Sequence, residues 1–599
     1  MSLVGCNAGP ILRWRDATIF RSAAIATTIT LDHARSRTIT LRAGGTAAPR
    51  PVVTWSSRGN FARIQAVVSD WTILIASSAV IRWPCVLAVL GACGGNGLPP
   101  VAGGVSLVLD IPNGPLDPKG FASVEVILHE PSGDVTRSTD MSPDGTFDLG
   151  AIDPTNSVSI EATLRNDSGA AVGYGRTAIS VAFAAGTEIV VPVRRPIAYI
   201  AGTVSRDRDD NGSTPELDWT EAPATFSDLS VGTRLDGTAQ IGSQAVLVIA
   251  AGPSLYLITQ DIDKPSGELT GPAKIVPVSA ADHQTGTALG GSMTGAVIDG
   301  AGSDDGSTLV IGTATQLFAV DTALGTVRPL AEGSFARVAL RTTDTGGLDA
   351  IAIKNRGATT GPCQASAELW WAKLSGDDAG PAQLIATGGF SDIAADRGHA
   401  YYVDACTGEL GEITAAGITK LWTVVADPTT TQATALAVSN GKAYVGFETA
   451  PATTALIVAS LTTGESRTLW NENAQQVVNA SDFEGVQRQL DAASAVFNHL
   501  EVGAGGDYVA LTTSAHFDGA AVPAASFPAM TIDTEELRVF DASTGGIVQR
   551  YRSWCDGVLN EGRNDIQSWE CASTAGQTEA ADADLEHHIG SMTFTFGKK

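Results

Sequence analysis

The sequence has little basic charge, few aromatic residues and only seven cysteines, and these shortages narrow what the chain can be. Its 599 residues carry 38 Lys and Arg against 64 Asp and Glu, a formal net charge of −26. Binding a nucleic-acid backbone requires clustered Lys and Arg, and the body of the chain has no such cluster. The composition therefore argues against a nucleic-acid partner. Hydrophobic residues make up 44%, enough apolar material to argue against wholesale disorder.

Sequence motifs of the common enzyme classes are also missing. The chain contains no HExxH zinc motif, GxSxG elbow, P-loop or GxGxxG dinucleotide loop. The eight His residues are scattered, and we interpret the pair His587-His588 as part of a solvated acidic tail rather than a metal site. These absences favour a protein that is not an enzyme. A catalytic set of acids assembled from separate parts of the chain would leave no such motif and stays an alternative.

Short β-rich segments separated by tight turns fill residues 101–196. VSLVLD (105–110), ASVEVILH (122–129) and VSIEATLR (158–165) alternate or are β-rich, and turns such as PSGD (131–134) separate them. This pattern predicts a small β-sandwich. It resembles the transthyretin-like or carboxypeptidase-regulatory-like modules of exported proteins.

Residues 197–599 contain an approximate repeat: a strand, a small or acidic turn, then another strand. The clearest copies are QLFAVDTALGTVRPL (316–330), AYYVDACTGELGEI (400–413), LIVASLTTGESRTLW (456–470) and LRVFDASTGGIVQRY (537–551). In Asp-x-x-x-Gly, the Asp side chain can cap the turn amides and Gly supplies a positive φ. The turn glycines are Gly267, Gly325, Gly376, Gly408, Gly464 and Gly545. Spacing near one blade length predicts a β-propeller, with a pair of ordinary sandwiches as the alternative.

The repeat resembles the YVTN-type and quinoprotein-like propellers of exported bacterial proteins. We count six blades, with a seventh if the terminal strand 592–596 pairs with a strand near 197–204, a closure that would hide the open sheet edges. The predicted fold class is therefore all-β: a small β-sandwich at 101–196 followed by a six- to seven-bladed β-propeller at 197–599. The resemblance also leaves a lactonase-like hydrolase or quinoprotein-like oxidoreductase as an alternative function.

A short apolar segment before Cys93 is typical of an export signal. WPCVLAVLGA (83–92) follows Arg82 and ends in Leu-Gly-Ala before Cys93, which resembles the lipobox of bacterial lipoproteins. The resemblance implies that Cys93 carries a diacylglycerol and that this lipid anchors the protein to a membrane. Gly94 at the next position favours the outer membrane, and 94–100 (GGNGLPP) predicts a flexible tether. The alternative is an uncleaved membrane anchor at 71–92.

The signal begins near residue 80, which is late for a leader. Residues 1–79 hold nine Arg against three acidic residues, a local charge of +6, so the remainder carries −32. We interpret 1–79 as an over-extended or disordered N-terminal segment and 80–93 as the signal with its lipid-anchor Cys.

Four cysteines remain in the exported part, and an even number there predicts two disulfides. They are Cys363, Cys406, Cys555 and Cys571. Locality favours Cys363–Cys406 and Cys555–Cys571 among the three pairings. The absence of CxxC argues against a zinc ribbon.

An acidic segment at 207–218, DRDDNGSTPELD, has the ligand pattern of a calcium loop. Its candidate ligands are Asp207, Asp209, Asn211, Ser213 and Asp218. Carboxylate oxygens at these spacings suit a hard cation, and the pattern resembles the dockerin variant of the EF-hand, with Asp at the last position. The alternative is a solvated linker between sandwich and propeller. A bound Ca²⁺ would be structural.

Together these features predict a membrane-anchored lipoprotein of the cell envelope whose propeller serves as a binding or scaffolding module. Its partner would be a protein or a glycan, and an assembly scaffold for outer-membrane proteins is a further alternative. The pair Trp370-Trp371 is interpreted as core packing rather than a sugar-stacking surface, because neighbouring strand residues point to opposite, buried faces.

Overall fold

The structure, a computed structural model, describes the residues in the ranges that follow. They are 25–32, 36–43, 53–54, 61–68, 74–75, 106–112, 120–130, 133–140, 147–150, 157–177, 181–182, 188–205, 214–221, 230–234, 243–263, 268–279, 285–343, 346–356, 366–376, 379–450, 452–473, 478–481, 487–519, 530–559 and 586–597. Within them the chain is all-β: strands β1 to β41 and one 3-10 turn, η1 (Ala504–Gly506). The predicted all-β class is confirmed. No helix in these ranges is long and apolar enough to cross a membrane.

Five strands precede residue 80. Four of them form one sheet in the order β3-β4-β1-β5, while the fifth, β2, pairs with β6 of the following domain. Their bounds are β1 (Ile25–Asp32), β2 (Ser36–Ala43), β3 (Val53–Thr54), β4 (Phe61–Val68) and β5 (Leu74–Ile75). The interpretation of 1–79 as lying outside the native protein stays a prediction.

The next eight strands build the first domain. They are β6 (Ser106–Pro112), β7 (Phe121–Glu130), β8 (Gly133–Asp140), β9 (Phe147–Gly150), β10 (Ser157–Asn166), β11 (Ala171–Arg176), β12 (Val181–Ala182) and β13 (Glu188–Arg194). In β7 every second residue is buried, as in Val124, Val126 and Leu128, which is the period of a strand with one face on a core. These side chains pack with those of β6, β10 and β13 in one cluster. β13 joins the two halves, because it pairs with β11 on one side and β6 on the other.

Seven further sheets follow, and their strands define seven blades. Blade 1 has β14 (Ile197–Ser205), β15 (Thr214–Glu221), β16 (Ser230–Arg234) and β41 (Glu586–Phe594); blade 2 has β17 (Ser243–Ala251), β18 (Ser254–Asp263) and β19 (Glu268–Val278); blade 3 has β20 (Val297–Gly302), β21 (Thr308–Thr313), β22 (Gln316–Asp321) and β23 (Thr326–Glu332); blade 4 has β24 (Phe335–Thr342), β25 (Leu348–Lys354), β26 (Ala367–Lys373) and β27 (Gln383–Gly388). Blade 5 has β28 (Phe390–Asp396), β29 (His399–Asp404), β30 (Glu409–Thr414) and β31 (Gly417–Thr423); blade 6 has β32 (Thr431–Ser439), β33 (Lys442–Thr449), β34 (Thr453–Ser460) and β35 (Ser466–Asn473); blade 7 has β36 (Val478–Ser481), β37 (Gln487–Gly503), β38 (Tyr508–Gly519), β39 (Met530–Asp541) and β40 (Ile547–Leu559).

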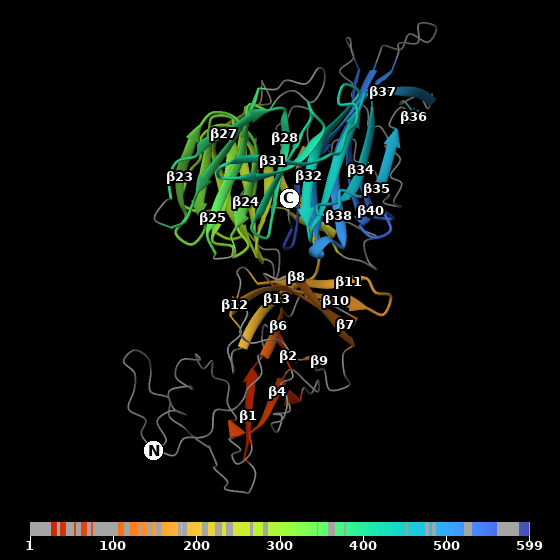
Figure 1. Ribbon diagram of the computed structural model, residues 1–599. Helices are drawn as coiled ribbons and strands as arrows, with labels where there is room; N and C mark the ends of the chain where they lie inside the picture. The colour runs from red at the N-terminus through yellow and green to blue at the C-terminus, as the bar shows by residue number, and fades with distance from the viewer. Residues whose placement is uncertain are drawn as a thin grey trace.

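The inner strands of the blades form a closed ring. β41, β17, β20, β24, β28, β32 and β37 contact one another in that order, and β37 returns to β41. The ring closes because β41, the last strand, pairs with β14, from Ala198 opposite Phe594 to Ser205 opposite Glu586. The conditional prediction of a seventh blade is therefore confirmed, and Figure 1 shows the propeller above the first domain.

Each inner strand carries a β-bulge at an equivalent place. The extra residues are Gly590, Val246, Ile298, Ala336, Ser391, Thr434 and Asn498. A bulge redirects the residue that follows it, and here that residue is often polar and points at the next blade. Ser591 Oγ accepts a hydrogen bond from Val248 N, Asp299 Oδ2 from Val338 N and Asp392 Oδ2 from Leu436 N, each at 2.8 Å.

The other junctions between blades use different residues for the same purpose. Gln260 Oε1 accepts from Val297 N at 3.0 Å, Glu448 Oε1 from Phe497 N at 2.8 Å and Glu501 Oε1 from Phe594 N at 2.9 Å. Between blades 4 and 5, Arg337 Nε lies 3.4 Å from Asp392 Oδ1. Since a buried amide left without an acceptor costs about 1–3 kcal/mol, these contacts help to fix each blade against its neighbour.

The repeated turn has the predicted mechanism. Asp321 Oδ1 accepts from Ala323 N and Leu324 N at 3.0 and 2.9 Å, and Gly325 has φ 64°. The turns at Asp404 and Asp541 repeat both features. The turns are not equivalent, however: those after Asp321 and Asp541 join third to fourth strands, whereas the one after Asp404 joins second to third. This difference explains why Gly408 follows Gly376 more closely than the other turn glycines follow one another.

Candidate functional site

The strand directions give the propeller two different faces. First-to-second and third-to-fourth connections lie on one face, which we call the covered face because the first domain packs there. Arg165 on β10 contacts Asp507 beside η1 at 3.1 Å, and Tyr508 Oη donates to Ala171 O at 3.0 Å. The opposite face, which holds the second-to-third connections, is the open face.

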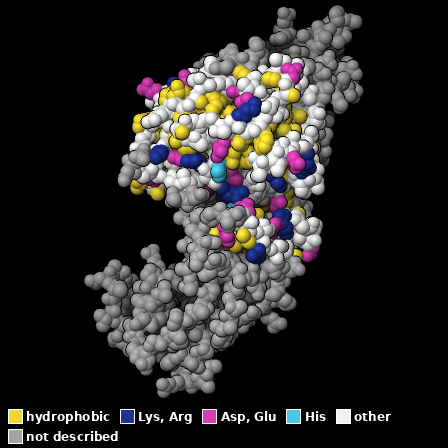
Figure 2. Space-filling view, in the orientation of Figure 1, with side chains coloured by type: hydrophobic (Ala, Val, Ile, Leu, Met, Phe, Trp, Pro, Cys, Tyr) yellow, Lys and Arg dark blue, Asp and Glu magenta, His cyan; other side chains and the backbone are white. Residues whose placement is uncertain are grey.

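The contact between the first domain and the covered face contains a buried charge cluster. Glu161 on β10 is 4% exposed, its Oε1 lies 3.3 Å from His129 Nε2, and its Oε2 accepts from Asn440 Nδ2 of blade 6 at 3.2 Å. Arg397 of blade 5 contacts the His129 ring, and Arg176 Nη2 lies 2.5 Å from Asp304 Oδ1 of blade 3. Figure 2 shows basic and acidic side chains side by side where the two domains meet.

Burial alone would raise the pKa of the Glu161 carboxyl, but the positive charges around it have the larger combined effect. His129, Arg397 and Arg176 together lower the pKa of Glu161 to about 2. Burial acts to lower the pKa of His129, and Arg397 acts in the same direction, yet the carboxylates of Glu161 and Asp134 raise it above its usual value. At the domain contact, the surroundings therefore favour the negatively charged form of Glu161 and the positively charged form of His129.

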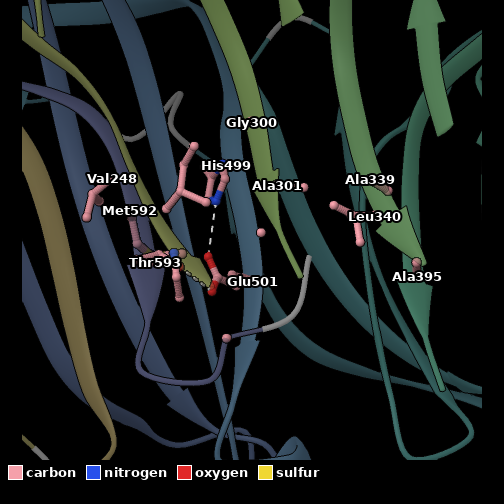
Figure 3. A pocket seen from close by; sticks show the side chains of 14 residues that line it. Val248, Gly300, Ala301, Ala339, Leu340, Ala395, His499, Glu501, Met592 and Thr593 are labelled. Atoms are coloured by element: carbon pink, nitrogen blue, oxygen red, sulfur yellow. Dashed lines mark hydrogen bonds and ion pairs between the residues drawn. The ribbon is translucent and has the colours of Figure 1, made fainter. Parts of the chain in front are cut away.

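The central channel holds a small cavity at its covered-face half. It is lined by inner strands of six blades, mostly by small residues such as Gly300, Ala301, Ala339 and Ala395 (Figure 3). Its water-accessible volume is about 50 Å³, which leaves room for a few water molecules and not for an organic substrate.

Two titratable side chains of β37 point into this cavity. His499 Nε2 lies 3.3 Å from Glu501 Oε2, the pair joined by a dashed line in Figure 3. Thr593 Oγ1 donates to Glu501 Oε1 at 2.8 Å. A serine-hydrolase arrangement needs the hydroxyl to donate to the imidazole, whereas this hydroxyl donates to the carboxylate. The contacts of Glu501 with Thr593 and Phe594 are those of a residue that holds β41 in the ring.

The predicted lipid and calcium sites fall largely outside the described residues. Cys93 and the segment 206–213, which holds Asp207, Asp209, Asn211 and Ser213, are not described. Asp218 lies in β15 opposite Ile200. The loop thus joins β14 to β15 inside blade 1 and is not a linker between the domains. No group of three or more metal-binding side chains occurs among the described residues, and the calcium site stays a prediction.

Of the four cysteines predicted to form disulfides, Cys406 is disulfide-bonded. It lies in the second-to-third turn of blade 5, while the second-to-third connection of blade 4, from β25 to β26, contains Cys363. Both connections belong to the open face of adjacent blades. Cys555 lies in β40 opposite Thr534, and Cys363 and Cys571 are outside the described residues. The two pairings stay predictions.

The tryptophan pair packs as predicted, whereas the histidine pair does not lie in a tail. Trp371 is 5% exposed beneath the Arg341 guanidinium, and Trp370 packs edge-on against Phe335. His587 and His588 lie in β41, opposite Val204 and Thr203, so they belong to a paired strand, and the interpretation of their side chains as solvated stays a prediction. The strand was not predicted to begin at Glu586, because its first residues are polar and its apolar residues begin only at Ile589.

Sequence patterns did not indicate the cluster around Glu161, the His499–Glu501 pair or the arginines of blade 4. Residues 161 and 440 are 279 positions apart, and no local motif joins them. The one local signal is a pair of acids four positions apart in an otherwise apolar strand, as in SDIAAD (391–396), where Asp392 and Asp396 are both buried.

No family model matches this chain, and no curated protein matches it. Solved structures resemble it at low identity: a periplasmic gluconolactonase of Pseudomonas aeruginosa is 10% identical with a TM-score of 0.35, covering 62% of this chain and 99% of that one. TolB from Acinetobacter baumannii is 10% identical with a TM-score of 0.29, covering 59% of this chain and 79% of that one. A prolyl endopeptidase is 10% identical with a TM-score of 0.33, covering 61% of this chain and 51% of that one. At these scores the likenesses say nothing about function, and the propeller rests on the strand pairing within this chain.

Proposed function

We propose that this chain is an exported, lipid-anchored binding protein whose propeller holds a partner on its open face. The observation that carries the proposal is the difference between the two faces. The covered face is occupied by the first domain through buried contacts such as Arg176–Asp304, with side chains 8% and 11% exposed. The cavity in the channel holds only a few water molecules. The open face is therefore the surface left for a macromolecular partner.

The shape of blade 7 supports the same face. β37 has 17 residues, whereas the inner strands of the other blades have 6 to 9. Because β37 ends at η1 on the covered face, its extra residues extend from the open face at about 3.3 Å each. Figure 1 shows β36 and β37 at that end of the molecule. Such an extension gives the open face an enlarged surface for contact.

Photo-crosslinking can test which face binds. A photoreactive residue at Thr315 or Thr429, exposed on open-face connections, should crosslink one and the same partner in intact cells. The matched controls are Leu324, 75% exposed, and Thr463, both on third-to-fourth turns of the covered face. We expect at least a tenfold higher crosslinked yield from the open-face positions. Equal yields, or partners that differ between Thr315 and Thr429, would contradict the proposal.

The lipid anchor is tested separately. Cys93→Ser should move the protein from the membrane fraction to the soluble fraction, because the thiol is the acylation site of the lipobox pattern. The matched control is Cys85→Ser, the same substitution within the apolar segment, which should leave the fractionation unchanged. Mass spectrometry of the wild-type protein should show an acylated N-terminal Cys93. An unmodified thiol at position 93 in membrane-extracted protein would remove the anchor from the proposal.

A further inference from the structure

Two arginines of blade 4 lie together at the open-face end of the channel. Arg337 follows the bulge of the inner strand β24, and Arg356 comes two residues after the end of β25. The two strands are antiparallel, with Phe335 opposite Lys354, so both arginines lie at the same end of the blade. Arg356 reaches across blade 5, since its Nη2 donates to Thr434 O of blade 6 at 3.0 Å.

Their guanidinium groups have more donors than partners among the described residues. A guanidinium has five N–H donors. Arg337 Nη1 donates to Ala336 O at 2.9 Å, and its Nε faces Asp392 at 3.4 Å. Arg356 Nε is buried and has no hydrogen-bond partner among the described residues. A buried unpaired donor on a cation is costly, which favours a further acceptor at this site.

The acids nearby do not supply that missing acceptor. Asp392 and Asp299 already accept backbone N–H groups of the next blade, and so does Glu448. Burial, together with the positive charge of Arg337, lowers the pKa of Arg356 to about 10, and the attraction of the three acids is too weak to reverse this. Burial also raises the pKa of Glu448. These acids therefore leave the Arg356 Nε donor without an acceptor among the described residues.

We infer that Arg337 and Arg356 bind an oxyanion, the carboxylate or phosphate group of a small molecule, at the open mouth of the channel. Guanidinium groups pair with such oxygens through two parallel hydrogen bonds, which matches their planar shape. The cavity deeper in the channel holds only a few water molecules, so the charged group binds at the mouth and the rest of the molecule lies on the open face. This site goes beyond the proposed partner binding and needs no macromolecule.

Binding is tested on the purified full chain with inorganic phosphate and with succinate, against chloride at equal ionic strength. We expect a saturable rise in Tm and a calorimetric binding signal with at least one of the two anions. Arg356→Gln and Arg337→Gln should each weaken binding at least tenfold, and Arg356→Lys less, because one charge remains without the paired donors. The readout is the shift on adding the anion, so a lower starting Tm of a variant does not affect it.

Arg328→Gln is the matched control, since Arg328 lies exposed on the outer strand β23 of blade 3. It should bind the anion like wild type. A response to phosphate alone or succinate alone supports the site and identifies the preferred group. Absence of a saturable response to both anions, or equal binding by Arg356→Gln and wild type, would overturn the inference. Neither result bears on the crosslinking test of the open face, which uses no anion.

Discussion

A chain that ends before β41 is expected to lose the folded propeller. β41 is the inner strand of blade 1 and the neighbour of both β17 and β37, so its removal opens the ring at two junctions. Met592 and Phe594 are 1% and 0% exposed, and burial of such side chains contributes about 2 kcal/mol each. Together with the lost strand pairing, this is a large share of the roughly 5–15 kcal/mol that stabilises a domain.

The measurement is thermal unfolding by circular dichroism, with binding of a hydrophobic dye as a second readout. Truncation after residue 585 should abolish the cooperative transition, whereas removal of Lys598 and Lys599 alone should not change it. Glu501→Ala is the milder variant, because it removes the acceptor of Phe594 N and Thr593 Oγ1 and should cost about 3 kcal/mol. A truncated chain that unfolds cooperatively near the wild-type temperature would show that the ring does not depend on β41.

The closure was predictable because both of its strands are strongly β-prone and lie at the two ends of the repeat region. The turns were predictable for a local reason: Asp321, Asp404 and Asp541 each act on amides two or three residues away. Such contacts leave a pattern in consecutive residues, and the pattern survives changes in loop length.

The contacts between blades left no such pattern. Ser591, Asp299 and Asp392 have the same role at equivalent bulges, yet their residue types differ and unequal loops separate them along the chain. The arginines of blade 4 were missed for a related reason. The partner of Arg356 is the carbonyl of Thr434, 78 positions away, and a backbone acceptor carries no sequence signal. Sequence thus indicated the architecture, while the candidate site depends on contacts between distant residues.

The domain contact around Glu161 should be most stable at mildly acidic pH. The pKa of Glu161 is lowered to about 2, so its contribution is complete above the ordinary carboxyl pKa and is lost as the pH falls toward 2. The pKa of His129 is raised, so its contribution is complete below its ordinary value of 6.5 and is lost as the pH rises through the raised value. Both contributions coexist at about pH 5–6.

Removing Glu161 should have a large effect, because His129, Arg397 and Arg176 then lose the carboxylate that offsets their charges. Breaking a buried ion pair by removing one partner costs about 3–5 kcal/mol. We therefore expect Glu161→Gln to lower the stability of the domain contact by that amount at about pH 5.5 and to flatten both limbs of its pH profile. His129→Gln should flatten the alkaline limb and leave an acid limb, because Arg397 and Arg176 still face the carboxylate.

Thermal unfolding across about pH 3–9, with limited proteolysis to detect separation of the domains, gives the profile. His399→Gln is the matched control, since the His399 side chain is 59% exposed on blade 5 and pairs with Glu412 outside the domain contact. Its profile should coincide with wild type. The Arg397 contact affects the pH at which the alkaline limb occurs. A guanidinium can donate only to an unprotonated imidazole nitrogen, so this contact favours neutral His129. Glu161 and Asp134 instead favour the protonated, positively charged form of His129. Arg397→Gln should therefore move the alkaline limb to higher pH, and a move to lower pH would show that the two carboxylates do not control His129.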